Sequence, residues 1–102
     1  MRESEFQGIV IDMAHLYGWR VAHFRSVRTP TGYRTPVAAD GAGFPDLVLA
    51  KRGELIFAEL KTERGRMSDA HREWIKLLPG AVVWRPRDLE YIEGRLSRKA
   101  DG

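Results

Sequence analysis

The stretch FPDLVLAKRGELIFAELK, residues 44–61, contains two β-rich runs joined by the polar segment KRGE. A short polar segment between two such runs predicts a pair of antiparallel strands. Three charged residues interrupt the apolar pattern: Asp46, Glu59 and Lys61. Side chains alternate across a strand, so Glu59 and Lys61 project to one face, and pairing through the turn brings Asp46 close to Glu59. The sequence therefore predicts two carboxylates and an ammonium group at one end of a sheet.

Size and composition limit what such a cluster can belong to. The chain has 102 residues, of which 43% are hydrophobic and 30% charged, as expected for one globular domain spanning residues 1–102. No apolar run approaches 18 residues and no signal peptide is readable, so we expect no membrane association and a cytoplasmic location. The chain has no Cys, so any metal must be bound by oxygen or imidazole ligands.

Hydrophobic spacing and turn residues divide the whole chain into helices and strands. Apolar residues at helical spacing precede Gly18, Ser68 is a good helix N-cap, and the segment 28–44 holds two Pro and three Gly. The expected elements are a helix 3–17, a strand 19–27, a loop 28–44, strands 44–50 and 55–61, a helix 69–78, a strand 81–85 and a helix 88–96. The αβββαβα order predicts an α/β fold.

The distribution of charge indicates a polyanionic partner more strongly than the net charge of +3 does. No carboxylate occurs between Asp12 and Asp40, whereas Arg25, Arg28 and Arg34 lie in that window together with aromatic residues. Arginines and aromatic rings suit a nucleic-acid backbone and its bases, so we expect these three arginines to bind DNA. The alternative is a solvated Arg-rich strand and loop.

The charge cluster itself favours a metal site. Like charges held together in a partly dry site repel one another unless a cation intervenes. Mg²⁺ or Mn²⁺ is the natural cation, because it prefers oxygen ligands and is commonly bound by one or two carboxylates plus substrate phosphate. Lys61 could then orient or deprotonate an attacking water, which describes a phosphodiesterase site. The alternative is that Glu59 and Lys61 pair on an exposed edge strand while Asp46 only starts a turn.

Pro45-Asp46 followed by Glu59-Leu60-Lys61 resembles the motif of the PD-(D/E)xK nucleases, and GFPDLVL, AELK and VVWRP look closest to their small VRR-NUC subgroup from phages and prophages. The resemblance implies a restriction-endonuclease-like core with a mixed central sheet flanked by helices. It also implies Mg²⁺ or Mn²⁺ held by Asp46, Glu59 and the Leu60 carbonyl, with Lys61 as the catalytic lysine. Branched DNA as substrate, a homodimer, and a bacterial or phage-infected host cell are implied as well.

The same resemblance directs attention to both flanking helices. The family's first helix usually carries an acid followed four residues on by Gln, a spacing that Glu3 and Gln7 match. At 100° per residue, Glu3 lies about 60° from the centre of the apolar stripe and Glu5 about 100° away, so we choose Glu3 as a further catalytic acid and candidate metal ligand, with Gln7 contacting DNA. Either acid could also simply be a favourable charge in a first helical turn. His71 stands where the family often has Gln, and either contacts phosphate or water there or packs beside Trp74.

These observations predict a metal-dependent DNA endonuclease that hydrolyses phosphodiester bonds in branched DNA such as Holliday junctions or flaps. Structure-specific cleavage is favoured because one small domain leaves no room for a separate sequence-reading module. The alternative, from another class of protein, is a basic nucleic-acid-binding module whose nuclease core is inactive or depends on a partner.

Overall fold

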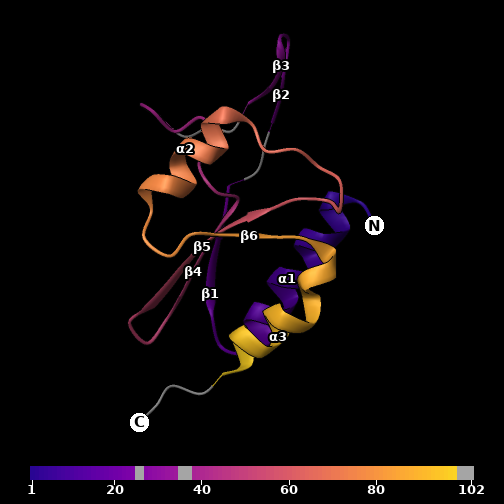
Figure 1. Ribbon diagram of the computed structural model, residues 1–102, viewed down its shortest axis with the longest axis vertical. Helices are drawn as coiled ribbons and strands as arrows, with labels where there is room; N and C mark the ends of the chain where they lie inside the picture. Colours follow the sequence, from indigo (N-terminus) through magenta and orange to yellow (C-terminus); the bar gives the residue numbers. More distant parts are fainter. Residues whose placement is uncertain (25–26, 35–37, 99–102) are drawn as a thin grey trace.

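Four strands form the central sheet of the computed structural model, in the order β1–β4–β5–β6 (Figure 1). The antiparallel part consists of β1 (Arg20–His23), β4 (Leu47–Lys51) and β5 (Glu54–Leu60), whereas β6 (Val82–Trp84) pairs with β5 in parallel. The sheet is therefore mixed. The structure describes residues 1–24, 27–34 and 38–98.

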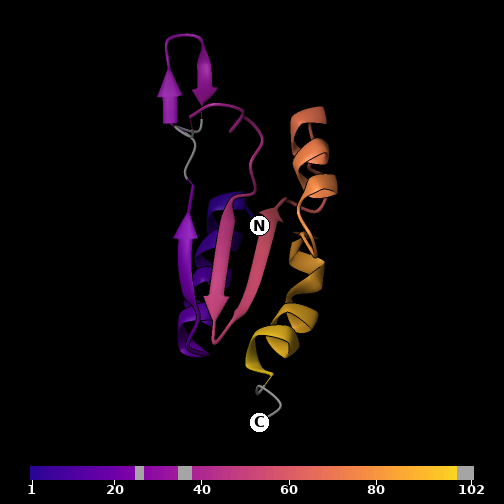
Figure 2. The ribbon, with the colours of Figure 1, turned by 90° about the vertical axis from the view of Figure 1, so that its left-hand side faces the viewer.

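Three helices surround this sheet and complete a single compact α/β domain. Two of them, α1 (Glu3–Leu16) and α3 (Leu89–Ser97), contact each other and lie along the sheet (Figures 1 and 2). The third, α2 (Asp69–Leu77), lies near the end of the sheet that is uppermost in both views. A short 3₁₀ turn, Pro86–Asp88, leads into α3. Only α1 and α3 bury residues in the core, whereas α2 buries none completely.

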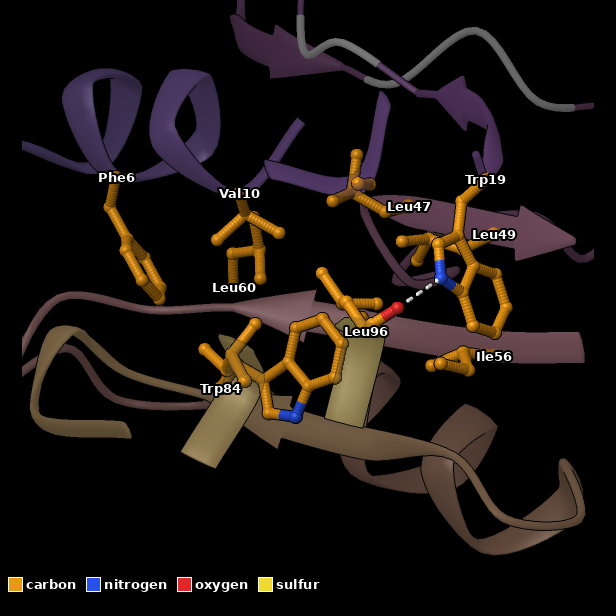
Figure 3. Close-up of a cluster of buried hydrophobic side chains, with 12 residues drawn as sticks. Phe6, Val10, Trp19, Leu47, Leu49, Ile56, Leu60, Trp84 and Leu96 are labelled. Carbon is orange, nitrogen blue, oxygen red and sulfur yellow. Dashed lines mark hydrogen bonds between the residues drawn. The ribbon is translucent and has the colours of Figure 1, made fainter. Parts of the chain in front are cut away.

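The core lies between the sheet and the pair formed by α1 and α3 (Figure 3). Phe6 and Val10 are fully buried on α1 and meet Leu47 and Leu60, which occupy the inward positions of β4 and β5. Full burial of each such side chain contributes about 1.5–3 kcal/mol to stability. The indole Nε1 of Trp19 donates a hydrogen bond of 2.9 Å to the Leu96 carbonyl, which ties the start of β1 to the end of α3. Within the part of the chain that the structure describes, the buried core residues are Phe6, Val10, Ala14, Trp19, Leu47, Leu49, Ile56, Ala58, Leu60, Trp84, Ile92 and Leu96.

The turn between β4 and β5 confirms the antiparallel pair predicted from the sequence. Arg52 and Gly53 both have positive φ, 46° and 83°, and two such residues in succession give the two-residue turn whose twist matches that of the flanking strands. The pairing runs from Lys51 opposite Glu54 to Leu47 opposite Ala58. Because this register follows from a local turn, Asp46 must lie near Glu59.

The prediction of one strand over 19–27 followed by a loop over 28–44 was wrong. The first strand ends at His23, and β2 (Val27–Thr29) pairs with β3 (Gly32–Arg34) in a separate antiparallel hairpin that extends away from the rest of the domain (Figures 1 and 2). The Pro and Gly residues between 28 and 34 were read as loop formers, but the short segment Pro30–Thr31 joins two strands. The αβββαβα order did not include this hairpin.

The other predicted elements are present with small shifts at their ends. Ser68 caps α2 as expected, since its Oγ accepts a hydrogen bond of 3.2 Å from the His71 amide. Leu77 in the last turn of α2 is 64% exposed. Across the described residues, no helix has both the length and the apolar character needed to cross a membrane.

Candidate active site

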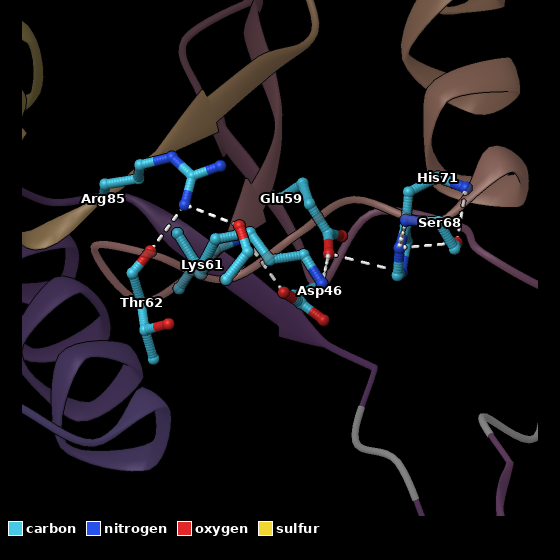
Figure 4. A network of polar contacts seen from close by, with 9 residues as sticks. Asp46, Glu59, Lys61, Thr62, Ser68, His71 and Arg85 are labelled. Carbon is cyan, nitrogen blue, oxygen red and sulfur yellow. Dashed lines mark hydrogen bonds and ion pairs between the residues drawn. The ribbon is translucent and has the colours of Figure 1, made fainter.

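Asp46 is held at the entrance to β4 by backbone groups on two sides. Its carbonyl oxygen accepts a hydrogen bond of 2.8 Å from the Phe24 amide, which continues the pairing of β1 with β4 by one residue. Its carboxylate Oδ2 accepts a hydrogen bond of 2.9 Å from the Leu60 amide at the end of β5 (Figure 4). The position and the side chain of Asp46 are therefore both determined by the sheet.

Glu59 is the only buried polar or charged residue among those described, with 1% of its surface exposed. One carboxylate oxygen, Oε2, lies 3.5 Å from Lys61 Nζ and 3.3 Å from His71 Nε2 (Figure 4). The other oxygen, Oε1, is buried and has no hydrogen-bond partner in the described part of the chain. The alternative of an exposed Glu59–Lys61 pair is therefore wrong, because burial removes Glu59 from solvent.

Burial changes the protonation of both carboxyl groups. Burial and the charge of Asp46 together raise the pKa of Glu59 to about 8, although Lys61 partly offsets them. Burial likewise raises the pKa of Asp46 to about 6, against the lowering effect of the Leu60 amide. Two adjacent carboxyl groups with raised pKa values need a cation before both can ionise near neutral pH.

His71 contacts Glu59 from the first turn of α2. Its Nδ1 accepts a hydrogen bond of 3.4 Å from the Ser68 amide and lies 2.9 Å from Ser68 Oγ. The Ser68 hydroxyl already accepts from the His71 amide, so its own hydrogen is free to point at Nδ1. This pattern makes Nδ1 an acceptor and places the ring hydrogen on Nε2, which faces Glu59.

Burial, and then the charge of Lys61, lower the pKa of His71, which favours this neutral form. The two expected roles of His71, contact with phosphate or packing beside Trp74, did not include a contact with Glu59. Trp74 instead donates its indole N–H to the Asp40 carbonyl at 3.1 Å and packs edge to face on Phe44. The Ser68–His71–Glu59 connection was missed because it depends on where α2 lies over the sheet.

Arg85 is a second residue that sequence reasoning missed. Its Nη1 donates to the carbonyl oxygens of Thr62 at 2.6 Å and Gly65 at 2.8 Å, which fixes the loop that follows Lys61 (Figure 4). The Lys61 amide also donates to the Trp84 carbonyl at 3.0 Å. The strand before Arg85 thus holds the backbone on the C-terminal side of the charge cluster. The contact of Arg85 with this loop depends on the parallel register of β5 with β6. Because no local turn joins these two strands, that register could not be predicted from the sequence.

Glu3 and Gln7 lie on α1, and the structure distinguishes Glu3 from Glu5. The charge of Glu3 contributes to the raised pKa of Asp46, although its side chain is exposed. Glu5 instead pairs with Arg2 at 3.3 Å on the surface. Gln7 is half-buried.

For several other predicted site residues, the structure gives no contact that bears on the predicted role. Leu60 directs its amide at Asp46, and its carbonyl as a metal ligand stays a prediction. Arg25 lies outside the described residues, and Arg28 and Arg34 are placed only by the backbone of β2 and β3.

Comparison with protein-family models gives no match to this chain, and comparison with curated proteins gives none either. The family resemblance therefore depends on the motif residues alone. Within the described residues, no group of three or more His, Cys, Asp and Glu side chains is arranged to hold a metal ion. The charge cluster offers two carboxylates, Asp46 and Glu59, with Lys61 and His71 beside them.

Proposed function

We propose that this protein is a metal-dependent DNA endonuclease that hydrolyses phosphodiester bonds in branched DNA such as Holliday junctions or flaps. The proposal includes a restriction-endonuclease-like core of the PD-(D/E)xK type, closest to its VRR-NUC subgroup. The mixed sheet and its three helices are compatible with this core. A homodimer in the cytoplasm of a bacterial or phage-infected cell is part of the same proposal.

The observation that carries the proposal is the unequal environment of the two oxygens of Glu59. Lys61 and His71 both approach Oε2, whereas Oε1 is buried without a hydrogen-bond partner among the described residues. An unpaired buried carboxylate oxygen costs free energy, on the order of 1–3 kcal/mol or more for a charged group. A ligand that satisfies this oxygen removes that cost, and a cation does so most effectively because the carboxylate of Asp46 is close enough to raise the pKa of Glu59.

The donor set fits Mg²⁺ or Mn²⁺. These ions prefer oxygen ligands, keep several waters and often use only one or two protein carboxylates, so the lack of a third acidic or imidazole ligand in the described cluster does not conflict with them. Asp46 and Glu59 would hold the ion, with the Leu60 carbonyl and Glu3 as further candidate ligands. When bound, such an ion polarises the phosphate and neutralises negative charge that develops on it.

The surrounding residues supply the remaining functions. The side chain of Lys61 is only 15% exposed, and its ammonium group would orient the attacking water and offset negative charge that develops on the phosphate. His71, Gln7 and the three arginines at 25, 28 and 34 are the proposed DNA contacts. His71 Nε2 lies 3.3 Å from Glu59 Oε2 and its Nδ1 lies 2.9 Å from Ser68 Oγ, so the ring is fixed in position beside the charge cluster.

One gel assay tests the proposal. Labelled single-stranded, duplex, flap and four-way-junction DNA are incubated with the protein and Mg²⁺ or Mn²⁺, and the expected result is cleavage of the branched substrates. Asp46→Asn, Glu59→Gln and Lys61→Ala should each abolish cleavage, because they act as one assembly. Asp69→Asn is the matched control, since this acid lies at an exposed helix start and pairs with Arg72 at 3.5 Å.

Two results would contradict the proposal in different ways. Full activity in any of the three site variants removes that residue from the mechanism. Binding of every DNA without cleavage under all metal conditions favours the alternative, a basic nucleic-acid-binding module whose core is inactive or depends on a partner. Circular dichroism of each variant shows whether a loss of cleavage reflects chemistry or unfolding.

A further inference from the structure

A hollow of about 520 Å³ lies at the opposite end of the sheet from the charge cluster. It is formed by the C-terminal end of α1 with Tyr17 and Gly18, by Arg20 on β1, and by Lys51 and Arg52 where β4 turns into β5. In Figure 1 this region is the lower end of the domain, where α1 leads into β1. We call it the distal groove.

The distal groove is strongly basic. Three of its residues are cations, namely Arg20, Lys51 and Arg52, and none of its lining residues is acidic. Within the described residues, no ion pair joins any of these three cations to a carboxylate. Other arginines of the surface do have such partners, for example Arg87, which lies 3.3 Å from Glu63. The groove therefore concentrates positive charge that the described part of the protein does not neutralise.

One of the cations is held in place. Lys51 Nζ donates a hydrogen bond of 2.6 Å to the Tyr17 carbonyl at the end of α1 and lies 6.0 Å from the centre of the Trp19 ring. Holding the lysine at a helix C-terminus is favourable for the helix dipole and explains why Lys51 is present. It does not explain Arg20 and Arg52, which are both exposed and complete the basic rim.

Arg20 on the rim of the groove lies on the same face of the sheet as the charge cluster, whereas Lys51 and the end of α1 lie on the opposite, core face. Alternation along β5 puts Leu55 on the same side as Glu59, and Leu55 pairs with Ala50, which in turn pairs with Arg20. Leu55 is 54% exposed and Ala50 is also exposed, so this end of the face is open. The five steps along the strand from Asp46 to Lys51 span about 17 Å at about 3.3–3.4 Å per residue.

We propose that the distal groove binds backbone phosphates of the same DNA whose scissile phosphate lies at Asp46 and Glu59. This inference rests on the proposed nuclease function and extends it by a second contact surface. One strand of duplex DNA carries a phosphate every 3.4 Å along its axis, so about 17 Å corresponds to about five base pairs. A duplex arm that runs along β4 from the charge cluster reaches Arg20 and Arg52 at that distance, and both guanidinium groups suit phosphate oxygens.

The test measures how DNA affinity depends on salt. All proteins carry Asp46→Asn so that the DNA stays intact, and a labelled duplex of about 20 base pairs, long enough to span both surfaces, is titrated by fluorescence anisotropy at several salt concentrations. The groove variant is Arg20→Gln/Arg52→Gln, and the matched control is Arg72→Gln/Arg87→Gln, which removes the same charge from arginines that already have carboxylate partners. Loss of two phosphate contacts should reduce the slope of log affinity against log salt by about 1.8 in the groove variant.

An equal change of slope in both variants would overturn the inference, because net charge alone would then account for the binding. The inference also fails if inorganic phosphate raises the melting temperature of the protein through this groove while the DNA slope stays constant. If the double variant does not fold, Arg20→Gln alone is used, with an expected reduction of about 0.9.

The cleavage assay with the unmodified protein separates this inference from the proposed function. Cleavage together with an unchanged slope would contradict DNA binding by the distal groove and would leave the proposed nuclease function intact. A reduced slope without any cleavage would support the distal groove as a DNA contact and would contradict the proposed nuclease function.

Discussion

Replacement of Glu59 by Gln should change how the stability of the metal-free protein depends on pH. Glu59 is 1% exposed and has a pKa of about 8 in the folded protein, against 4.5 for an ordinary glutamate. The folded state therefore holds a proton that the unfolded state has released. The resulting stability is fully present below about pH 4.5 and is lost as the pH rises through about 8.

The size of the effect follows from the two pKa values. At about 1.36 kcal/mol per pKa unit, Glu59 alone should destabilise the protein by about 4 kcal/mol between pH 5 and pH 9. About a third of this loss falls between pH 7 and pH 9, where Asp46, with a pKa of about 6, is already ionised. Glutamine has nearly the same shape and no charge, so Glu59→Gln should not show this loss.

Urea unfolding in EDTA, followed by circular dichroism at pH 5, 6, 7, 8 and 9, measures the difference directly. The free energies of unfolding of the wild type and of Glu59→Gln should diverge steadily as the pH rises, with the variant more stable at pH 9. Glu63→Gln, at an exposed glutamate in the loop after β5, is the control and should follow the wild type. Parallel curves for the wild type and Glu59→Gln would refute the reasoning, because Glu59 would then be as easily ionised as a surface glutamate.

Three further expectations concern the residues around the site. Asp46→Asn should stabilise the protein in EDTA by on the order of 1 kcal/mol, because it removes a carboxylate whose partial burial raises its pKa to about 6, and Mn²⁺ should raise the melting temperature of the wild type more than that of the variant. Equal responses to Mn²⁺ in thermal melts would contradict the metal site. In His71→Ala, Mn²⁺ should raise the melting temperature less than it does in the wild type, and His71→Gln, which keeps a hydrogen-bond donor, should partly restore the rise. Identical melts for the two variants would show that the donor is unimportant. Replacing Arg25, Arg28 and Arg34 together by Ala should reduce the slope of log affinity for DNA against log salt by about 2.7. An unchanged slope would indicate that the three arginines are solvated and do not contact DNA.

The homodimer is tested separately from the site. Light scattering at working concentration, with and without four-way-junction DNA, should give twice the mass of the 102-residue chain. The physical reason is that one small domain with one charge cluster cannot cut two strands of a junction in concert. A monomer under both conditions would count against the dimer and would leave the chemistry at Asp46 and Glu59 unaffected.

The sequence alone was sufficient for those parts of the fold and site that depend on local rules. Ser68 was identified as a helix cap because the cap bond joins residues three apart. Asp46 was placed near Glu59 because a two-residue turn sets the register of β4 and β5 within a few residues. The mixture of helices and strands followed from hydrophobic spacing in the same way.

Local rules misplaced the chain between 19 and 34. Proline and glycine promote turns in loops and in hairpins alike, so composition did not reveal that β2 and β3 pair around Pro30. Whether such a segment becomes a hairpin depends on the strands flanking the turn, and these are only three residues long here.

What only the tertiary structure decided is the environment of the carboxylates. Three features depend on where α2 and β6 pack against β5: the burial of Glu59, its contact with His71, and the hydrogen bond from Arg85 to the Thr62 carbonyl. These elements return to the sheet through a long crossover, and the register of a parallel pair is set by packing across the whole domain, with no turn to fix it. The sequence thus determined which charged residues meet, because neighbouring strands bring them together. The fold determined their pKa values and hydrogen bonds, because desolvation depends on every element that covers them.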